Sequence, residues 1–175
     1  MRVALISTGG TIEKTYDALK GALTNQLSVL DVMLSQLELH GLDLVRIPLM
    51  NKDSLDMVPA DHALIARTAL AMAEAYDGVI VVHGTDRLQV SGERTCTMAQ
   101  GILNVPIIFT GAMKPYELRS SDALQNITEA LLAVQLLKSG VYLVMHNQVL
   151  TFPGVIKDTR RGLFVRAEDL AEDPL

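Results

Sequence analysis

The sequence has 175 residues, of which 49% are hydrophobic and 20% charged, a balance typical of a globular domain with a well-filled core. The net charge is −5, no basic cluster stands out and aromatic residues make up only 4%, which argues against nucleic-acid binding. Cys96 is the only cysteine, so an intrachain disulfide is excluded, and the four histidines lack ligand-like spacing, so no metal site is expected. Because no apolar run is long enough for a signal peptide or a membrane span, we expect a cytoplasmic protein with no membrane partner.

Short apolar runs alternate along the chain with segments of helical periodicity. The predicted elements, in chain order, are a strand at 3–6, a helix at 27–37, a strand at 42–49, a helix at 59–72, a strand at 79–82, a helix at 91–100, a strand at 105–109, a helix at 122–134, a strand at 141–145 and short extended pieces around Pro153. This alternation predicts a parallel sheet with helices on both faces. We therefore expect residues 1–175 to form one α/β domain, with a single doubly wound, mostly parallel sheet of the flavodoxin-like type.

Ligands of doubly wound folds bind beyond the carboxyl ends of the strands. Four segments that follow predicted strands are rich in small or polar residues, namely 7–11, 51–56, 83–86 and 110–115. Four such loops on one rim predict a polar pocket.

The first of these loops carries Gly9 and Gly10 directly before Thr11. Paired glycines let the backbone approach a ligand closely, although a tight strand-to-loop turn would need them as well. The dinucleotide fingerprint G-x-G-x-x-G and the P-loop lysine are both absent, which disfavours a nucleotide-binding domain.

Thr85 and Asp86 end one predicted strand, and Lys114 follows the neighbouring one. A threonine hydroxyl is a poor nucleophile until a base removes its proton, and a lysine oriented by a carboxylate can be that base. These three residues therefore suggest a proton relay, with a structural Lys–Asp ion pair as an equally weighted alternative.

Three segments together resemble the bacterial-type L-asparaginases, a family of threonine amidohydrolases. They are Ser-Thr-Gly-Gly-Thr-Ile at 7–12, His-Gly-Thr-Asp at 83–86 and Thr-Gly-Ala-Met-Lys-Pro at 110–115. The resemblance implies hydrolysis of L-asparagine to L-aspartate and ammonia through a threonine nucleophile and an acyl-enzyme, with no metal and no cofactor. The short chain resembles the Rhodospirillum-type, single-domain form, which is equivalent to the N-terminal domain of longer members.

The resemblance also implies roles for individual residues. The catalytic residues would be Thr11, Tyr16, Thr85, Asp86 and Lys114. The substrate-binding residues would be Gly10, Asp53, Ser54, Thr85 and Asp86. In this scheme Thr11 is acylated with help from Tyr16, Ser54 holds the α-carboxylate of the substrate, and Asp86 holds its α-ammonium group.

The sequence departs from the family pattern at Leu55, at Arg87-Leu88-Gln89 and in the short distance between Thr11 and Tyr16. Without a second domain, one side of the pocket would be open, and a homodimer or higher homo-oligomer is expected to close it. Two alternatives stay open: a glutamine-directed amidase subunit and a non-catalytic amino-acid-binding module. Only measured turnover separates an enzyme from such a module.

Overall fold

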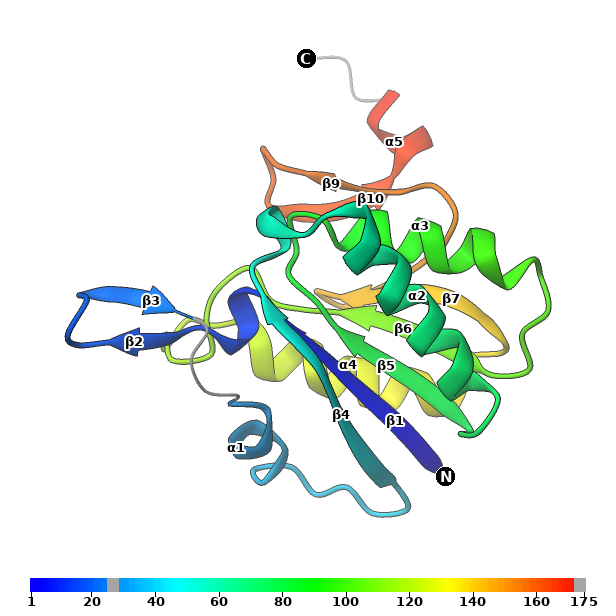
Figure 1. The fold of residues 1–175 in the computed structure, drawn as a ribbon, viewed down its shortest axis with the longest axis horizontal. Helices are drawn as coiled ribbons and strands as arrows, with labels where there is room; N and C mark the ends of the chain where they lie inside the picture. Colours follow the sequence, from blue (N-terminus) through cyan, green and yellow to red (C-terminus); the bar gives the residue numbers. More distant parts are fainter. Residues whose placement is uncertain (25–28, 172–175) are drawn as a thin grey trace.

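A mostly parallel sheet forms the centre of the computed structural model, which describes residues 1–24 and 29–171 (Figure 1). In spatial order its strands are β4 (Asp43–Lys52), β1 (Arg2–Gly9), β5 (Gly78–Val82), β6 (Pro106–Thr110), β7 (Gly140–Met145) and β8 (Gln148–Thr151). The first five are parallel, and β8 runs antiparallel to β7. The predicted doubly wound sheet is confirmed, because the order of its parallel strands is that of flavodoxin-like folds.

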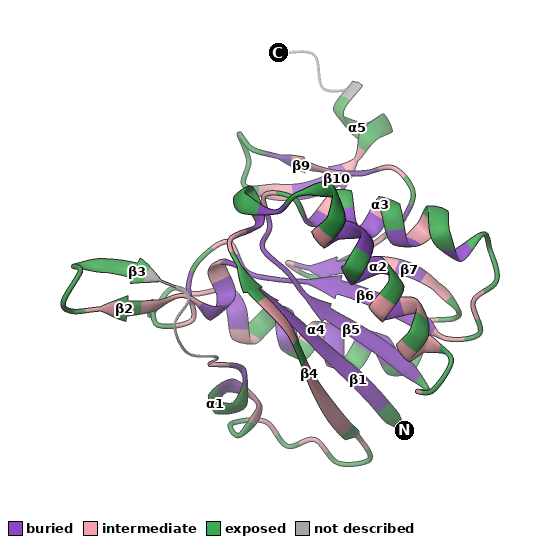
Figure 2. Ribbon diagram, in the orientation of Figure 1, coloured by how far each residue is buried: buried purple, intermediate pink, exposed green. Residues whose placement is uncertain are grey.

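Helices cover both faces of this sheet. Side chains of α1 (Leu30–Leu34) and α4 (Ala123–Leu136) pack against one face, in a cluster that includes Leu5 and Ile80. Side chains of α2 (Pro59–Ala73) and α3 (Leu88–Ala99) pack against the other face, with Ile6 and Val81. Since neighbouring side chains of a strand point to opposite faces, burial on both sides requires the continuous apolar runs seen in the sequence. Figure 2 shows this burial along the central strands.

Two predicted elements differ from the structure in instructive ways. The helix expected at 27–37 is reduced to α1, and Leu27 lies outside the described residues, whereas Leu37 packs against the core without being helical. The strand expected at 42–49 continues to Lys52 in spite of Pro48. Proline is tolerated there because β4 is the edge strand of the sheet and needs no donor on its outer side.

Smaller elements surround the sheet. They are η1 (Thr11–Glu13), β2 (Thr15–Asp17), β3 (Ala22–Thr24), η2 (Ser54–Asp56), β9 (Val155–Asp158), β10 (Leu163–Arg166) and α5 (Ala167–Ala171). The β2–β3 hairpin projects away from the body of the molecule, and β9 and β10 form a second hairpin above the carboxyl ends of the sheet (Figure 1). In the described parts of the chain, no helix has both the length and the apolar character of a membrane span.

Candidate active site

The carboxyl ends of β1 and β5 lie side by side where the strand order reverses, a place we call the switch point. The loops that follow are packed so closely there that side chains would collide. A Cβ atom on Gly10 would lie 2.4 Å from the Cα atom of Gly84, and one on Gly84 would lie 2.7 Å from Ser54 Oγ. A Cβ atom on Gly111 would lie 2.3 Å from the carbonyl oxygen of His83. Loops after β1, β4, β5 and β6 therefore meet at one rim, as ligand binding in this fold class requires.

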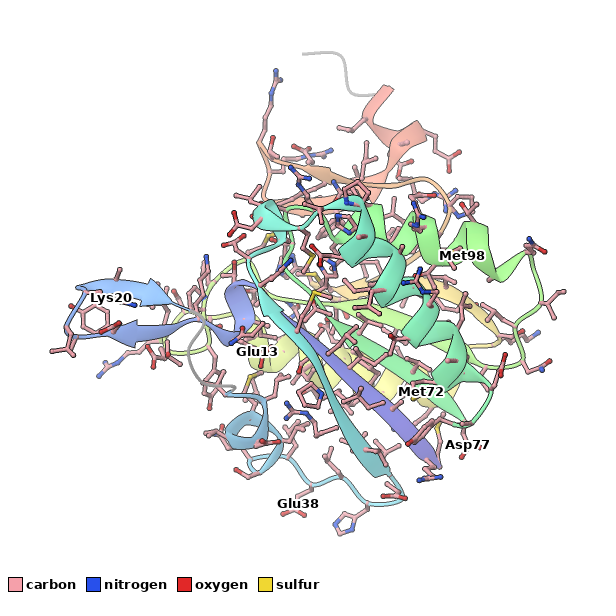
Figure 3. All side chains as sticks on the ribbon, in the orientation of Figure 1. Glu13, Lys20, Glu38, Met72, Asp77 and Met98 are labelled. Carbon is pink, nitrogen blue, oxygen red and sulfur yellow. The ribbon has the colours of Figure 1, made fainter. Side chains whose placement is uncertain are left out.

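Thr11 begins the turn η1 directly after Gly10. Gly10 has a φ of 84°, a conformation that favours glycine, and its N–H donates to the carbonyl of Lys52 at 3.0 Å. Ile12 is fully buried, and buried Glu13 accepts a hydrogen bond from the N–H of Gly9 at 3.2 Å. Figure 3 marks Glu13 at the base of the β2–β3 hairpin. The neighbours of Thr11 on both sides are thus held by the core, while Thr11 itself remains partly exposed.

A lysine contacts Thr85 and Asp86 at the switch point, but it is not Lys114. Lys157, on β9, donates from Nζ to Thr85 Oγ1 at 2.9 Å and to Asp86 Oδ1 at 2.6 Å. Its side chain is only 12% exposed, and Thr85 is buried. These three groups place a hydroxyl and a carboxylate within hydrogen-bond distance of one lysine amino nitrogen, as a proton relay requires.

The structure therefore corrects the expected position of Lys114. The side chain of Lys114 is exposed and donates to the carbonyl oxygen of Ser120 at 3.2 Å. Its own N–H and that of Met113 donate to the carboxylate of Asp122, which turns this loop back toward the start of α4. Local sequence reasoning missed Lys157 because 71 residues separate it from Asp86 and only the placement of the β9–β10 hairpin brings them together.

Ser54 carries the one buried side-chain hydroxyl of this rim that lacks a protein partner among the described residues. It is 1% exposed, and its Oγ atom forms no hydrogen bond in that part of the chain. An unsatisfied buried hydroxyl is costly, so a ligand group that binds it would be stabilised. The Oγ atom lies beside Gly84, next to the buried threonine.

Asp53, by contrast, is already occupied by protein groups. Its Oδ1 atom accepts the N–H of Leu55 at 3.0 Å, which caps η2, and its Oδ2 atom accepts from Lys14 Nζ at 2.7 Å. The hydrogen bond from Lys14 lowers the pKa of this carboxyl group. Asp53 thereby links the loop of Thr11 to the loop of Ser54.

Tyr16 is placed differently from the other expected site residues. It lies on β2 opposite Leu23, and the residue is 61% exposed. Its backbone N–H donates to Glu117 Oε2 at 2.6 Å. The structure thus brings Gly10, Ser54, Thr85 and Asp86 together but leaves Tyr16 on the projecting hairpin.

Comparisons with known proteins show which sequences and structures this chain resembles. A glutamyl-tRNA(Gln) amidotransferase subunit of Haloquadratum walsbyi is 38% identical over 146 residues, covering 82% of this chain and 33% of that protein. The L-asparaginase of Thermococcus kodakarensis is 28% identical over 165 residues, covering 93% of this chain and 49% of the enzyme. Its structure superposes with a TM-score of 0.83 at 26% identity, covering 95% of this chain and 51% of that one. A probable cytoplasmic L-asparaginase of Campylobacter jejuni has a TM-score of 0.68 at 25% identity, covering 89% of this chain and 48% of that one.

These relatives are longer than the chain, which spans about a third to a half of their length. The family described as "Asparaginase, N-terminal" matches residues 2–161. The match covers every loop of the switch point as well as Lys157 on β9. The chain therefore belongs to the asparaginase N-terminal family.

Proposed function

We propose that this chain hydrolyses the side-chain amide of L-asparagine to L-aspartate and ammonia through a threonine nucleophile. The observation that carries the proposal is the contact of Lys157 with both Thr85 and Asp86 beside the glycine-rich turn of Thr11. A buried hydroxyl held by an amine and a carboxylate is an arrangement for moving a proton. A purely structural ion pair would not require the threonine hydroxyl as a third member.

In the proposed reaction, Thr11 attacks the amide carbon of the substrate and forms a tetrahedral intermediate. Lys157, as the neutral amine, takes up the proton through Thr85, while Asp86 keeps the amine in place. The intermediate collapses when the C–N bond breaks and the nitrogen leaves as ammonia with that proton. Water then attacks the threonine ester, which releases L-aspartate and restores the hydroxyl. Backbone N–H groups of the glycine-rich loops would stabilise the oxyanion in both steps.

The substrate is a zwitterion, so its pocket needs a donor for the carboxylate and an acceptor for the ammonium group. The unpartnered Ser54 hydroxyl supplies the donor in this proposal, together with the backbone near Gly10. Asp86 supplies the acceptor, since its side chain is 39% exposed and only Oδ1 contacts Lys157. Tyr16 would assist Thr11 only if the hairpin moved toward the switch point.

The proposal includes a cytoplasmic enzyme related to the Rhodospirillum-type L-asparaginases that assembles as a homodimer or larger homo-oligomer. A second candidate, a glutamine-directed amidase subunit, is favoured by the 38% identity to the amidotransferase subunit of Haloquadratum walsbyi. The two candidates share the chemistry and differ in the length of the amide side chain that is accepted.

Ammonia release from L-asparagine and from L-glutamine tests both candidates in one experiment. We expect the purified chain to act on asparagine, and Thr11→Ala and Thr85→Ala to abolish this activity. Mass spectrometry of peptides after acid quenching would show which threonine carries the aspartyl ester. Preference for glutamine would favour the amidase subunit. Aspartate binding without turnover of either amide would leave only the binding module.

A further inference from the structure

A chain of three buried polar side chains lies behind the switch point. His62 on α2, Ser91 on α3 and His83 at the end of β5 are each no more than 3% exposed. Ser91 Oγ lies 2.7 Å from His62 Nδ1 and 2.8 Å from His83 Nε2, and His83 Nδ1 lies 2.8 Å from the carbonyl oxygen of Gly84. The two imidazole rings are stacked, with centroids 6.2 Å apart and planes inclined by 13°. None of these side chains is used in the reaction proposed above.

The chemistry of these groups allows one arrangement of protons. A carbonyl oxygen can only accept, so the proton of His83 lies on Nδ1 and is donated to Gly84. The Nε2 atom of neutral His83 then accepts, and the single proton of the Ser91 hydroxyl is donated to it. His62 must in turn donate from Nδ1 to Ser91 Oγ. Its Nε2 atom remains a buried acceptor with no partner in the described residues.

The reverse direction would require a charged histidine in the core. If Ser91 donated to His62, His83 would need a second proton on Nε2 to donate to Ser91. Burial opposes this, because it lowers the pKa of His83 to about 4 and also lowers that of His62. The charged groups Arg87, Arg94 and Asp61 act on His62, and the two arginines also disfavour its protonation.

This chain of hydrogen bonds ends on the peptide group that joins Gly84 to Thr85. A peptide is planar, so fixing the carbonyl of Gly84 also fixes the direction of the Thr85 N–H on the opposite side. Hydrogen bonds that follow one another in a chain polarise each other, so the donor to Gly84 makes the Thr85 N–H a stronger donor. That N–H forms no hydrogen bond within the described residues. Gly84 has no side chain to hold this peptide, so the hydrogen bond from His83 adds a directional restraint to the close packing of the backbone around it.

We propose that His83, fixed by Ser91 and His62, is a positioning residue that orients the Gly84–Thr85 peptide for amide hydrolysis. The inference rests on the proposed function, since it assigns the peptide N–H to the substrate. The arrangement of protons can be tested without any turnover, because each group donates its hydrogen bond in the direction from His62 toward Gly84. Misplacement of a reacting group by about 1 Å can cost on the order of a hundredfold in rate.

The first test is nitrogen NMR of the whole chain with labelled histidine, which reports the proton position without any substrate. We expect both buried histidines to be neutral at pH 7, with the proton on Nδ1. Observation of the proton of His83 on Nε2 would overturn the proposal whether or not the chain is an enzyme.

Two variants of one residue provide the matched test. The amide nitrogen of asparagine reaches the position of Nδ1, so His83→Asn keeps the donor to Gly84, whereas the longer glutamine in His83→Gln reaches the position of Nε2 and loses it. We expect kcat to fall on the order of tenfold to a hundredfold in His83→Gln with KM little changed, and to be largely retained in His83→Asn. The amide resonance of Thr85 should move only in His83→Gln.

Ser91→Ala covers the case in which either His83 variant fails to fold, because it removes a single hydroxyl. It leaves His83 Nε2 without its donor, so it should weaken the preference of the proton for Nδ1 and shift the Thr85 amide resonance by a smaller amount than His83→Gln. Equal kcat values and equal Thr85 resonances in all three variants and the wild type would contradict the positioning role. If the wild type is inactive, the histidine and Thr85 resonances still test whether hydrogen bonds run from His62 through Ser91 and His83 to Gly84.

Discussion

The switch point and the β2–β3 hairpin carry residues of the same proposed reaction but are built in opposite ways. At the switch point, Ser54 and Thr85 are buried, and glycines let the loops approach until no Cβ atom would fit. On the hairpin, Tyr16 is 61% exposed and Leu19 is fully exposed. Figure 3 marks Lys20 at the far end of this hairpin.

The difference teaches where preorganisation comes from in this molecule. The groups at the switch point are held by core strands on both sides, so their geometry exists before a ligand binds. At the base of the hairpin, the N–H of Tyr16 donates to Glu117 Oε2. Regions with few buried apolar contacts open at low free-energy cost, so we expect the hairpin to open more readily than the switch point.

The largest expected effect contrasts two lysines. Lys157→Met should lower kcat for ammonia release by about 10²–10⁴-fold, because it removes the amine that contacts Thr85 and Asp86. Lys114→Met should change kcat by less than about twofold, since its side chain is exposed and contacts only a backbone carbonyl. Steady-state kinetics of both purified variants measures this contrast. Loss of activity in Lys114→Met alone would restore the role first expected of it.

The switch point and the hairpin each contain a glycine with a positive φ angle, Gly10 and Gly21, and replacing them should affect the free energy of unfolding differently. Gly10→Ala should lower the free energy of unfolding by about 3 kcal/mol, because it adds backbone strain at φ 84° to a collision with Gly84. Gly21→Ala, at φ 62° with nothing within 4 Å of the new Cβ atom, should cost only about 1 kcal/mol. Urea unfolding of both variants gives the two values. Equal losses would mean that the switch point is not tightly packed.

The buried histidine predicts a pH dependence that the hairpin should not share. The pKa of His83 falls from 6.5 to about 4 on folding, so the unfolded chain binds the proton more readily between these values. Its contribution to stability is therefore complete above pH 6.5 and is lost as the pH falls to 4, a change of about 3 kcal/mol.

Urea unfolding measured from pH 7 to pH 4 checks this window. His83→Asn should show a much shallower loss there, with the remainder due to His62, whose pKa is also lowered. The carboxyl groups of Asp53 and Asp122 have pKa values below 3.8, so their contributions are lost only at lower pH. An unchanged slope in His83→Asn would argue against a neutral, buried His83.

The smallest effect is expected at the base of the hairpin. Glu117→Ala removes the acceptor of the Tyr16 N–H and should change the global free energy of unfolding by less than about 0.5 kcal/mol. Local opening should nevertheless increase, so trypsin should cleave after Lys20 faster than in the wild type. Cleavage after Lys157 should stay slow in both proteins, because that side chain is 12% exposed. Equal cleavage rates after Lys20 would show that Glu117 does not hold the hairpin.

Much of the architecture was readable from the sequence for a simple physical reason. Strands buried on both faces need uninterrupted apolar runs, so residues 79–82 and 105–109 predicted β5 and β6 within one residue of their observed bounds. Polar loops that follow parallel strands lie at the same edge of the sheet. The sequence therefore predicted one pocket that contains Gly10, Ser54 and Thr85, and these loops do meet in the structure. The helix expected at 27–37 did not match α1 in length, because Leu34 and Leu37 pack against the core although the helix ends at Leu34.

Other features depended on contacts between distant segments, which local patterns do not encode. Lys157 reaches Thr85 only because the β9–β10 hairpin folds over the carboxyl ends of the sheet, whereas Lys114 follows a strand that ends near Thr85 yet turns outward. The proton order through His62, Ser91 and His83 likewise requires three elements to pack together. By itself, the sequence determined which faces are buried and which loops share a rim, because the spacing of apolar residues along each element shows which side of it is buried. Tertiary structure decided which lysine contacts Thr85, because that contact depends on where the β9–β10 hairpin packs against the sheet.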